Sequence, residues 1–381
     1  MSSRRLVALS LVFVACVVAT SALIATHMFR HGASSSIATV TTSVARVTST
    51  AASVTTLARS STATTSSSTL GLEPIPSWRY VRIMGVGIDV DWLSFEWVEH
   101  QYFYWRQHGV SIPKLFRERG FSNVRIRVCG DVVSNATLLE MLKEVVNDCL
   151  KAGIVPIISY CANELREHPT DPSALHHFVE WWVTVAKAFK GYPYTLSYDL
   201  IIETSGPIKS YPEVLNKAYT EVIKAIRSID RYRIIIVTPA NVSKPWALRY
   251  LRIPWDPYII AEWHVFAGGP CHRNRFVGME VCRSVIQQAV NVALNWSKRT
   301  GVPTWVGAWR PNCYPKKGKG RGPILPEDVA IEFSKLMVSE LCSHGIPYDV
   351  NADTKFFDYY NLSWYPSQRE LLNVVLNCSY R

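Results

Sequence analysis

The sequence predicts a closed (β/α)8 barrel of the TIM type over residues 71–381 of a 381-residue chain. Short β-branched runs alternate with helical patterns eight times in about 300 residues, which is the repeat number and size of such a barrel. Several helical patterns end at a glycine followed at once by the next apolar run, as at Gly120, Gly153, Gly301 and Gly345. A doubly wound open sheet is the alternative, but no glycine-rich phosphate loop follows the first strand.

The expected strands are short and mostly apolar, as strands buried on both faces are. They are predicted over residues 83–88, 124–128, 155–160, 198–203, 234–238, 258–264, 304–308 and 348–351. The clearest helices have apolar residues three or four positions apart. They are predicted over residues 136–152, 174–189, 212–229, 280–299, 327–344 and 367–378, and the mid-helix pair Trp181 and Trp182 is assigned to the core.

The first 33 residues have the pattern of a targeting segment. Arg4 and Arg5 precede an apolar run over residues 6–25, which is long enough to span a bilayer as a helix. An uncleaved membrane anchor is the favoured interpretation, and a cleaved signal peptide is the alternative. Basic residues at the start place the rest of the chain outside the cell. The sequence therefore predicts a protein on the extracellular face of the membrane, or a secreted one.

Residues 34–70 form the predicted linker. Ser and Thr occupy 22 of the 36 positions from 34 to 69, and no acidic residue occurs there. Such a segment has no large side chains to bury, so it is expected to be a flexible or glycosylated stalk. Five sites further along match the N-glycosylation pattern. They are Asn135, Asn241, Asn295, Asn361 and Asn377.

The charge of the chain argues against nucleic acid as a partner. Of 41 basic residues, five lie before residue 71, where there are no acids, so the barrel carries only +6 of the net charge of +11. A domain with mixed charges of this kind is not an obvious nucleic-acid binder.

Eight of the nine cysteines lie in the barrel, and an extracellular location makes disulfides plausible. Their pairing cannot be derived from the sequence; Cys271 and Cys282 are the first pair to check. No spacing typical of zinc ligands occurs, so no metal site is expected, and no cofactor motif is present.

In a barrel of this type, functional residues lie at the carboxyl ends of the strands. The polar candidates there are Asp89, Asp91, Arg125, Arg127, Asp131, Asn163, Glu164, Glu203, Asn241, Glu262, His264, Trp309, Arg310, Asn351 and Asp353. Carboxylates can perform acid–base chemistry, and indole rings can stack on pyranose rings. This combination favours a carbohydrate ligand.

Five segments follow one another in an order typical of one family. They are residues 120–126, 198–203, 260–266, 302–309, and 355–358 with Trp364. Together they resemble glycoside hydrolase family 5, the cellulase and mannanase family. The resemblance implies that Arg125 lies beside the nucleophile, that Glu203 takes the place of the acid/base, and that His264 belongs to the His-x-Tyr pair of the sixth strand.

The chain departs from the family pattern at three of these positions. The seventh strand usually ends in Gly-Glu-Phe or Gly-Glu-Trp, but here Ala308 occupies the nucleophile position, and alanine has no oxygen to attack a sugar. Ile202 replaces the asparagine before the acid/base, and Phe266 replaces the tyrosine. A misplaced seventh strand is an alternative explanation, but no glutamate occurs between Glu280 and Glu327, so a small register shift cannot restore the motif.

Two functions are therefore predicted. One is an extracellular hydrolase of β-linked polysaccharide, of endo-β-1,4-glucanase or mannanase type, with Glu203 as acid/base. Its second carboxylate would be Glu262, or otherwise Asp353, Asp131 or Glu164. Arg125, Asn163, His264 and Trp309 are the expected substrate contacts. The other function is a catalytically silent barrel that binds polysaccharide. A monomer is expected in both cases, with the membrane as a further partner through the N-terminal helix.

Overall fold

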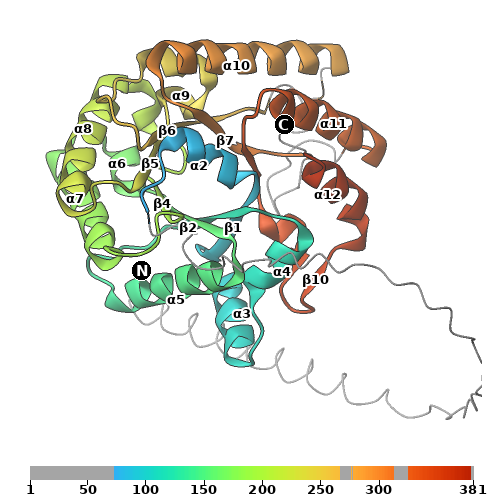
Figure 1. The fold of residues 1–381 in the computed structure, drawn as a ribbon, viewed down its shortest axis with the longest axis horizontal. Coiled ribbons are helices and arrows are strands. Elements are labelled where there is room, and N and C mark those ends of the chain that lie inside the picture. Colours follow the sequence, from blue (N-terminus) through green and yellow to red (C-terminus); the bar gives the residue numbers. More distant parts are fainter. Residues whose placement is uncertain (1–72, 267–275, 277, 313–324, 379–381) are drawn as a thin grey trace, which may run out of the picture. The chain divides into compact units, whose positions relative to one another are not determined.

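The structure, a computed structural model, describes residues 73–266, 276, 278–312 and 325–378. Within these residues, eight parallel strands form a closed barrel in chain order, and the last strand pairs with the first (Figure 1). The predicted (β/α)8 architecture is confirmed. The barrel strands are β1 (Val86–Leu93), β2 (Asn123–Val128), β3 (Val155–Tyr160), β4 (Ser197–Asp199), β5 (Ile234–Val237), β6 (Ile259–His264), β7 (Thr304–Trp309) and β8 (Tyr348–Val350).

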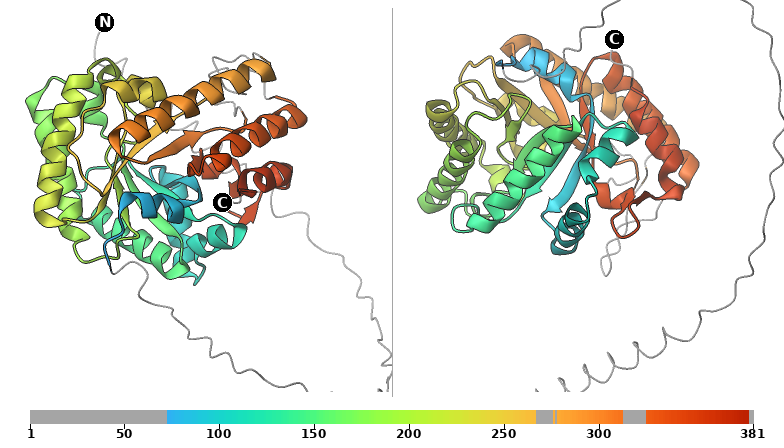
Figure 2. Two further views of the ribbon diagram at one scale, coloured as in Figure 1. Left: turned by 45° about the horizontal axis from the view of Figure 1, so that its top comes forward. Right: turned by 60° about the horizontal axis from the view of Figure 1, so that its bottom comes forward.

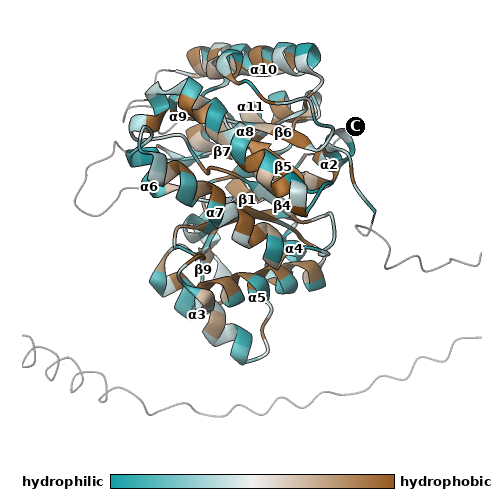
Figure 3. Ribbon diagram, turned by 90° about the vertical axis from the view of Figure 1, so that its left-hand side faces the viewer, coloured by the Kyte–Doolittle hydropathy of each residue, from teal (hydrophilic) through white to brown (hydrophobic). Residues whose placement is uncertain are grey.

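Helices cover the outside of the barrel (Figure 2). They are α3 (Glu96–Gln107), α4 (Ile112–Arg119), α5 (Ala136–Ala152), α6 (Asn163–Glu167), α7 (Pro172–Ala188), α8 (Pro212–Ile229), α9 (Ala240–Ser243), α10 (Met279–Thr300), α11 (Glu327–Ser343) and α12 (Arg369–Leu376). Hydrophobic and hydrophilic residues alternate around these helices in Figure 3, as expected for helices with one face on a sheet. Trp181 and Trp182 on α7 are fully buried, as predicted.

One further helix, α2 (Ser77–Met84), closes the amino-terminal opening of the barrel. Its residues Tyr80, Val81 and Met84 pack in one buried cluster with side chains from β3, β5, β6 and β7. Figure 1 shows α2 lying across this opening. The opposite opening, at the carboxyl ends of the strands, is thereby left as the place for a site.

Short elements connect the longer ones. In the described part of the chain, 3-10 turns lie after β4 and before β6, namely η1 (Pro207–Ser210) and η2 (Pro245–Tyr250), and after β8, namely η4 (Asp353–Lys355) and η5 (Pro366–Gln368). Strands β9 (Phe357–Asp358) and β10 (Ser363–Trp364) form a small antiparallel pair after β8.

The first and fourth strands differ most from the prediction, and the other strand boundaries agree to within one residue. The first strand begins at Val86 rather than at residue 83, because Ile83 and Met84 end helix α2 and Gly85 turns the chain with φ 58°. The first strand also continues to Leu93 rather than ending at residue 88. The fourth strand ends at Asp199 rather than at Glu203. Glu203 therefore lies in the loop that follows β4. Gly120, Gly153 and Gly301 adopt the left-handed conformation expected of helix C-caps.

Two disulfides join described residues, Cys129–Cys161 and Cys342–Cys378. The first connects the residues that directly follow β2 and β3, next to the carboxyl-end opening. The proposed partner of Cys282, Cys271, lies outside the described residues, as do the predicted targeting segment and stalk over residues 1–70. Among the helices that the structure describes, none combines the length and hydropathy needed to cross a membrane.

Candidate active site

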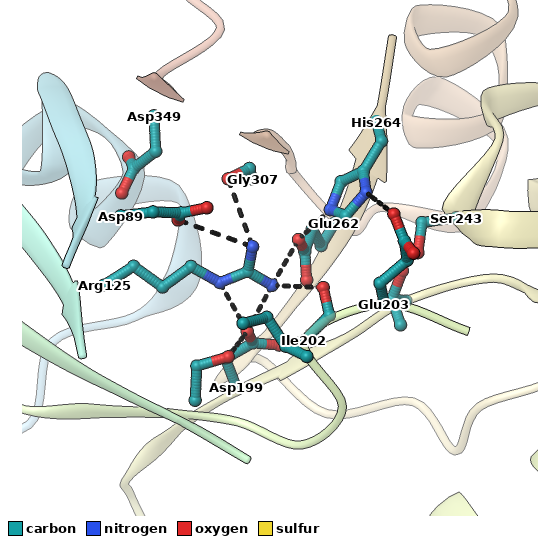
Figure 4. A network of polar contacts seen from close by, with 12 residues as sticks. Asp89, Arg125, Asp199, Ile202, Glu203, Ser243, Glu262, His264, Gly307 and Asp349 are labelled. Atoms are coloured by element: carbon teal, nitrogen blue, oxygen red, sulfur yellow. Dashed lines mark hydrogen bonds and ion pairs between the residues drawn. The ribbon is translucent and has the colours of Figure 1, made fainter. Parts of the chain in front are cut away.

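Arg125 on β2 is the centre of a buried polar network at the carboxyl-end opening (Figure 4). Its Nε and Nη2 atoms donate hydrogen bonds to Oδ2 of Asp199 at 2.8 and 2.5 Å. Its Nη1 atom donates to the carbonyl of Gly307 at 3.2 Å, and Nη2 donates to that of Ile202 at 2.8 Å. The guanidinium is fully buried. Its hydrogen bonds therefore fix the positions of β2, β4 and β7 relative to one another.

Carboxylates compensate the buried charge of Arg125. Burial alone would lower the pKa of the guanidinium, but Asp199, Glu262 and Asp89 outweigh this effect and raise it. Nη2 lies 2.6 Å from Oε1 of Glu262, and Nη1 lies 3.6 Å from Oδ1 of Asp89. The guanidinium also lies over the ring of Trp305, 5.2 Å from its centroid.

Glu262, on β6, is fully buried and bridges Arg125 to His264. Its Oε1 atom lies 2.6 Å from Nε2 of His264. A Cβ atom added to Gly307 would overlap the Glu262 carboxylate, so the glycine of β7 makes room for it. Burial raises the pKa of Glu262 to about 8. Its Oε2 atom has no hydrogen-bond partner among the described residues.

His264 connects the buried acid to an accessible one. Its Nδ1 atom lies 3.4 Å from Oε2 of Glu203, whose side chain is 33% exposed. Burial would lower the pKa of the imidazole, but Glu262 and Glu203 raise it to about 9. Burial would likewise raise the pKa of Glu203, but His264, Ser205 and Arg166 lower it to about 2. Near neutral pH, Glu203 is therefore ionised beside an imidazolium.

Two hydrogen bonds connect Thr204, the residue after Glu203, to a turn whose residues have a left-handed backbone conformation. Asn241, Val242 and Ser243 of α9 have φ values of 58, 60 and 57°. The Thr204 amide donates to Ser243 Oγ at 3.3 Å, and the Ser243 amide donates to Thr204 Oγ1 at 3.0 Å. A left-handed conformation is unfavourable for the β-branched Val242, so the paired hydrogen bonds offset a local cost. Backbone strain of this kind is most often found next to functional groups.

Comparison with known proteins agrees with this geometry. The sequence profile of the family described as Cellulase (glycosyl hydrolase family 5) matches residues 87–311. This match spans seven of the eight barrel strands, including β2 with Arg125 and β6 with Glu262, and the loop after β4 that carries Glu203.

The chain belongs to glycosyl hydrolase family 5.

One curated relative is Endoglucanase H from Acetivibrio thermocellus, 24% identical over 209 residues. The match covers 52% of this chain and 23% of that protein, so the chain spans about a quarter of its relative's length.

Two solved structures illustrate the similarity in fold. Cel5A of Thermotoga maritima in complex with mannotriose has a TM-score of 0.65 and 21% identity, covering 78% of this chain and 99% of its own. Cellulose synthase subunit Z of Clostridioides difficile has a TM-score of 0.62 and 19% identity, covering 77% and 99%. At these identities the comparison supports the barrel architecture.

The structure shows what the residues at the three departures from the family pattern contact. The Ile202 side chain stands where family 5 has asparagine, yet its backbone carbonyl accepts a hydrogen bond from Arg125. Phe266, in place of tyrosine, packs beneath the guanidinium of Arg310, 5.8 Å from the ring centroid. At the third position, Ala308 is buried at the end of β7 beside His264 of β6. Arg125 thus contacts a carboxylate from β6 where the family provides one from β7.

Asn163, predicted as a substrate contact, lies at the edge of this site. It is the exposed first residue of α6, and its Oδ1 atom accepts a hydrogen bond from Arg166 at 3.3 Å. Arg166 also donates to Ser205 Oγ, next to Glu203. Asn163 is thus connected to the loop of the accessible carboxylate.

The prediction that Trp309 is a sugar platform is wrong for this structure. Its side chain is fully buried and packs against Phe333 and Tyr348, with ring centroids about 6 Å apart. Trp309 ends β7 with its indole on the helix side of the barrel, because successive strand residues point to opposite faces.

The other candidates for a second carboxylate lie away from Arg125. Asp353 is buried after β8 and accepts hydrogen bonds from the Tyr359 hydroxyl and the Asp91 amide. Asp131 pairs with His177 and caps the turn at Ser134. Glu164 is exposed on α6. Of the predicted acids, only Glu262 contacts both Arg125 and His264.

Asp199 and Ser243 are residues of this site that were not among the predicted ones. Asp199 is the last residue of β4, on the strand just before the predicted acid/base Glu203, so its place at a strand end could have indicated it. No feature of the sequence indicates Ser243, because it reaches Thr204 only through the left-handed turn of residues 241–243. No group of three or more His, Cys, Asp or Glu side chains suited to a metal ion occurs in the described part of the chain.

Proposed function

We propose that this barrel is a glycoside hydrolase of β-linked glucan, with Glu203 as acid/base and Glu262 as the second carboxylate. The observation that carries the proposal is the contact between Arg125 and Glu262, at 2.6 Å. The arginine that accompanies the family's nucleophile keeps a carboxylate partner here, although Ala308 cannot provide it. Glucan as substrate is proposed by analogy with the endoglucanases that the chain resembles.

The two carboxylates favour inversion of configuration. They contact opposite nitrogens of one imidazole ring. The two carboxyl groups are thus separated by the width of the imidazole ring. Inverting glycosidases need such a separation, of about 6.5–9.5 Å, to leave space for a water. Alanine is shorter than glutamate by a carboxymethyl group, so Ala308 frees space next to Glu262. We propose that the attacking water occupies this space and bonds to Oε2 of Glu262.

Proton delivery uses the His264–Glu203 pair. Glu203 is ionised at rest, and the Nδ1 atom of the imidazolium lies 3.4 Å from its Oε2 atom, close enough for Nδ1 to donate its proton once substrate binds. As negative charge develops on the leaving glycosidic oxygen, that proton passes through Glu203 to the oxygen, while Glu262 accepts the proton of the water. One C–O bond breaks, one forms, and both protons are accounted for.

A silent glucan-binding barrel is the second candidate. The complete burial of Glu262 favours it, because a carboxylate that no solvent reaches must be exposed by substrate-induced movement before it can act. Loss of a catalytic carboxylate leaves stacking and hydrogen bonding to sugar intact.

The decisive experiment measures reducing ends released from carboxymethyl-cellulose, mixed-linkage β-glucan and mannan by the full chain and by a Glu203→Gln variant. Release that falls at least a thousandfold in the variant supports the hydrolase. No release by either protein, with both retarded in a gel containing one polysaccharide, supports the silent barrel. Equal release by both would contradict the role of Glu203.

The pH dependence of hydrolysis follows from the two raised pKa values. Glu262 must be deprotonated to act as base, so kcat/KM is expected to rise as pH increases through about 8. His264 must be protonated, so kcat/KM is expected to fall above about 9. Initial rates on β-glucan from pH 5 to 10.5 measure this narrow alkaline optimum. An optimum near pH 5 with no limb near 8 would contradict Glu262 as the base.

Thr204 is expected to position Glu203. A Thr204→Val variant keeps the shape but removes the hydroxyl that accepts from Ser243 and donates to the Pro239 carbonyl. We expect kcat to fall about tenfold with KM within twofold, because small misplacements of a catalytic group are costly. Thr204→Ser should restore kcat, and Thr220→Val on α8 is the control. Equal kcat for both valine variants would exclude this role.

The extracellular location is also part of the proposal. The disulfides Cys129–Cys161 and Cys342–Cys378 support it, because disulfides persist mainly in oxidising compartments. Protease treatment of intact cells should degrade the barrel, whereas a protected barrel would place it inside.

A further inference from the structure

A groove runs along the outer wall of the barrel, between η2, residues 251–255 and the C-terminal half of α10. It consists of two adjoining hollows of about 300 and 240 Å³, which share Arg249, Trp296 and Arg299 as lining residues. Its residues Thr300 and Val302 immediately precede β7, so the groove lies towards the amino-terminal side. Glu203 and Arg125 are at the opposite end of the strands, and the groove is separate from the candidate active site. Figure 1 shows α10 on the outside of the barrel.

The groove is positively charged. Arg249, Arg252 and Arg299 line it, and no acidic side chain does. None of the three forms an ion pair with a described residue: Arg249 lies over the ring of Tyr250, and Arg252 donates to backbone carbonyls. Guanidinium groups present paired donors whose geometry matches a carboxylate. The lining is therefore suited to bind an anion with carboxylate groups.

Exposed aromatic rings lie at both ends of the groove. Trp255 is 82% exposed, more than any other large apolar side chain of the described residues, and Trp246 at the other end is 36% exposed. Trp296 is buried beneath them. Covering an exposed indole ring with a flat apolar surface is favourable, because it removes the ring from water. The face of a pyranose ring is such a surface.

We propose that this groove binds a linear polysaccharide that carries carboxylates, such as a polyuronate. The arginines pair with the uronate carboxylates, and Trp246 and Trp255 stack on sugar rings at the two ends. Charge complementarity identifies the occupant as anionic, and the two separated indoles identify it as a chain of rings rather than a single anion. The proposal goes beyond β-glucan hydrolysis and does not depend on it.

Affinity electrophoresis of the full chain tests this proposal. The protein is produced without N-glycans, because the predicted glycosylation site Asn295 lines the groove. Polygalacturonate in the gel should retard the protein, and 0.5 M salt should weaken the retardation. Trp255→Ala and Arg299→Ala should each raise the dissociation constant at least tenfold. Two matched controls, Trp97→Ala on α3 and Arg283→Ala at the other end of α10, should bind as the parent chain does.

Three results would overturn the proposal. The first is that polygalacturonate does not retard the protein. The second is that the control variants lose as much affinity for polygalacturonate as Trp255→Ala and Arg299→Ala do. The third is that the protein binds phosphatidylglycerol vesicles through Trp255 but does not bind polygalacturonate. The Glu203→Gln variant should keep full polygalacturonate binding. Failure of hydrolysis therefore leaves this proposal intact, and failure of retardation leaves the proposed hydrolysis intact.

Discussion

Arg125→Met is expected to lower the free energy of unfolding by about 3–5 kcal/mol, the cost of leaving buried charges without a partner. The guanidinium is fully buried and contacts Asp199, Glu262 and Asp89. Methionine fills a similar volume but compensates none of these carboxylates. Urea denaturation of the full chain, followed by tryptophan fluorescence, measures the loss.

A control variant and a change of pH test whether the loss of stability in Arg125→Met comes from the buried network. Arg106→Met removes an arginine that also contacts two acids, Glu144 and Asp148, but whose side chain is 33% exposed. Its expected cost is below about 1 kcal/mol, because water screens the pair. The Arg125→Met deficit should narrow as the pH falls through about 8, the pKa of Glu262, because a protonated Glu262 needs no counter charge. A deficit equal to that of Arg106→Met would show that the network adds little stability.

Glu262→Gln is expected to lower kcat by about a hundredfold to ten-thousandfold, the usual contribution of a general base, with KM little changed. Glutamine retains an oxygen that can accept from Arg125 and His264, so the barrel should stay folded. Glu164→Gln, which alters an exposed acid on α6, is the control and should keep kcat within twofold. Unchanged kcat in Glu262→Gln would exclude Glu262 as the base.

The same pair of carboxylates predicts the stereochemistry of the product. Proton NMR of the first minutes of cellopentaose hydrolysis should show the α-anomer at the newly formed end, because a water attacks directly from the face opposite the leaving group. A β-anomer as first product would require a covalent intermediate and hence a nucleophile other than a water activated by Glu262.

The architecture was predictable from sequence because the pattern that determines it is local. Helices such as α5 and α8 carry their periodicity in consecutive residues, and glycines such as Gly153 indicate where they end. The sequence does not predict helix α2, because its last residues, Ile83 and Met84, continue into the apolar run of the first strand. Those residues pack against the amino ends of β3, β5, β6 and β7, a contact between segments far apart in sequence.

The candidate site was predictable only in part. Strand order placed Arg125, Glu203 and His264 at one end of the barrel, where the structure also places them. Burial was not predictable, because it depends on how neighbouring strands pack. It separates the partly exposed Glu203 from the fully buried Glu262 and Trp309. The pairing of Thr204 with Ser243 depends on positive φ angles in residues other than glycine, for which a sequence gives little indication.

The contact of Glu262 with Arg125 has a consequence for the chemistry that the barrel can perform. Adjacent strands in a sheet lie about 4.8 Å apart, so one guanidinium can reach a carboxylate from either β6 or β7. Asp199 pairs with the guanidinium whichever of these strands provides the second acid, so Arg125 keeps a counter charge in both arrangements. Under the mechanism proposed above, a carboxylate on β6 instead of β7 replaces double displacement by single displacement within the same barrel.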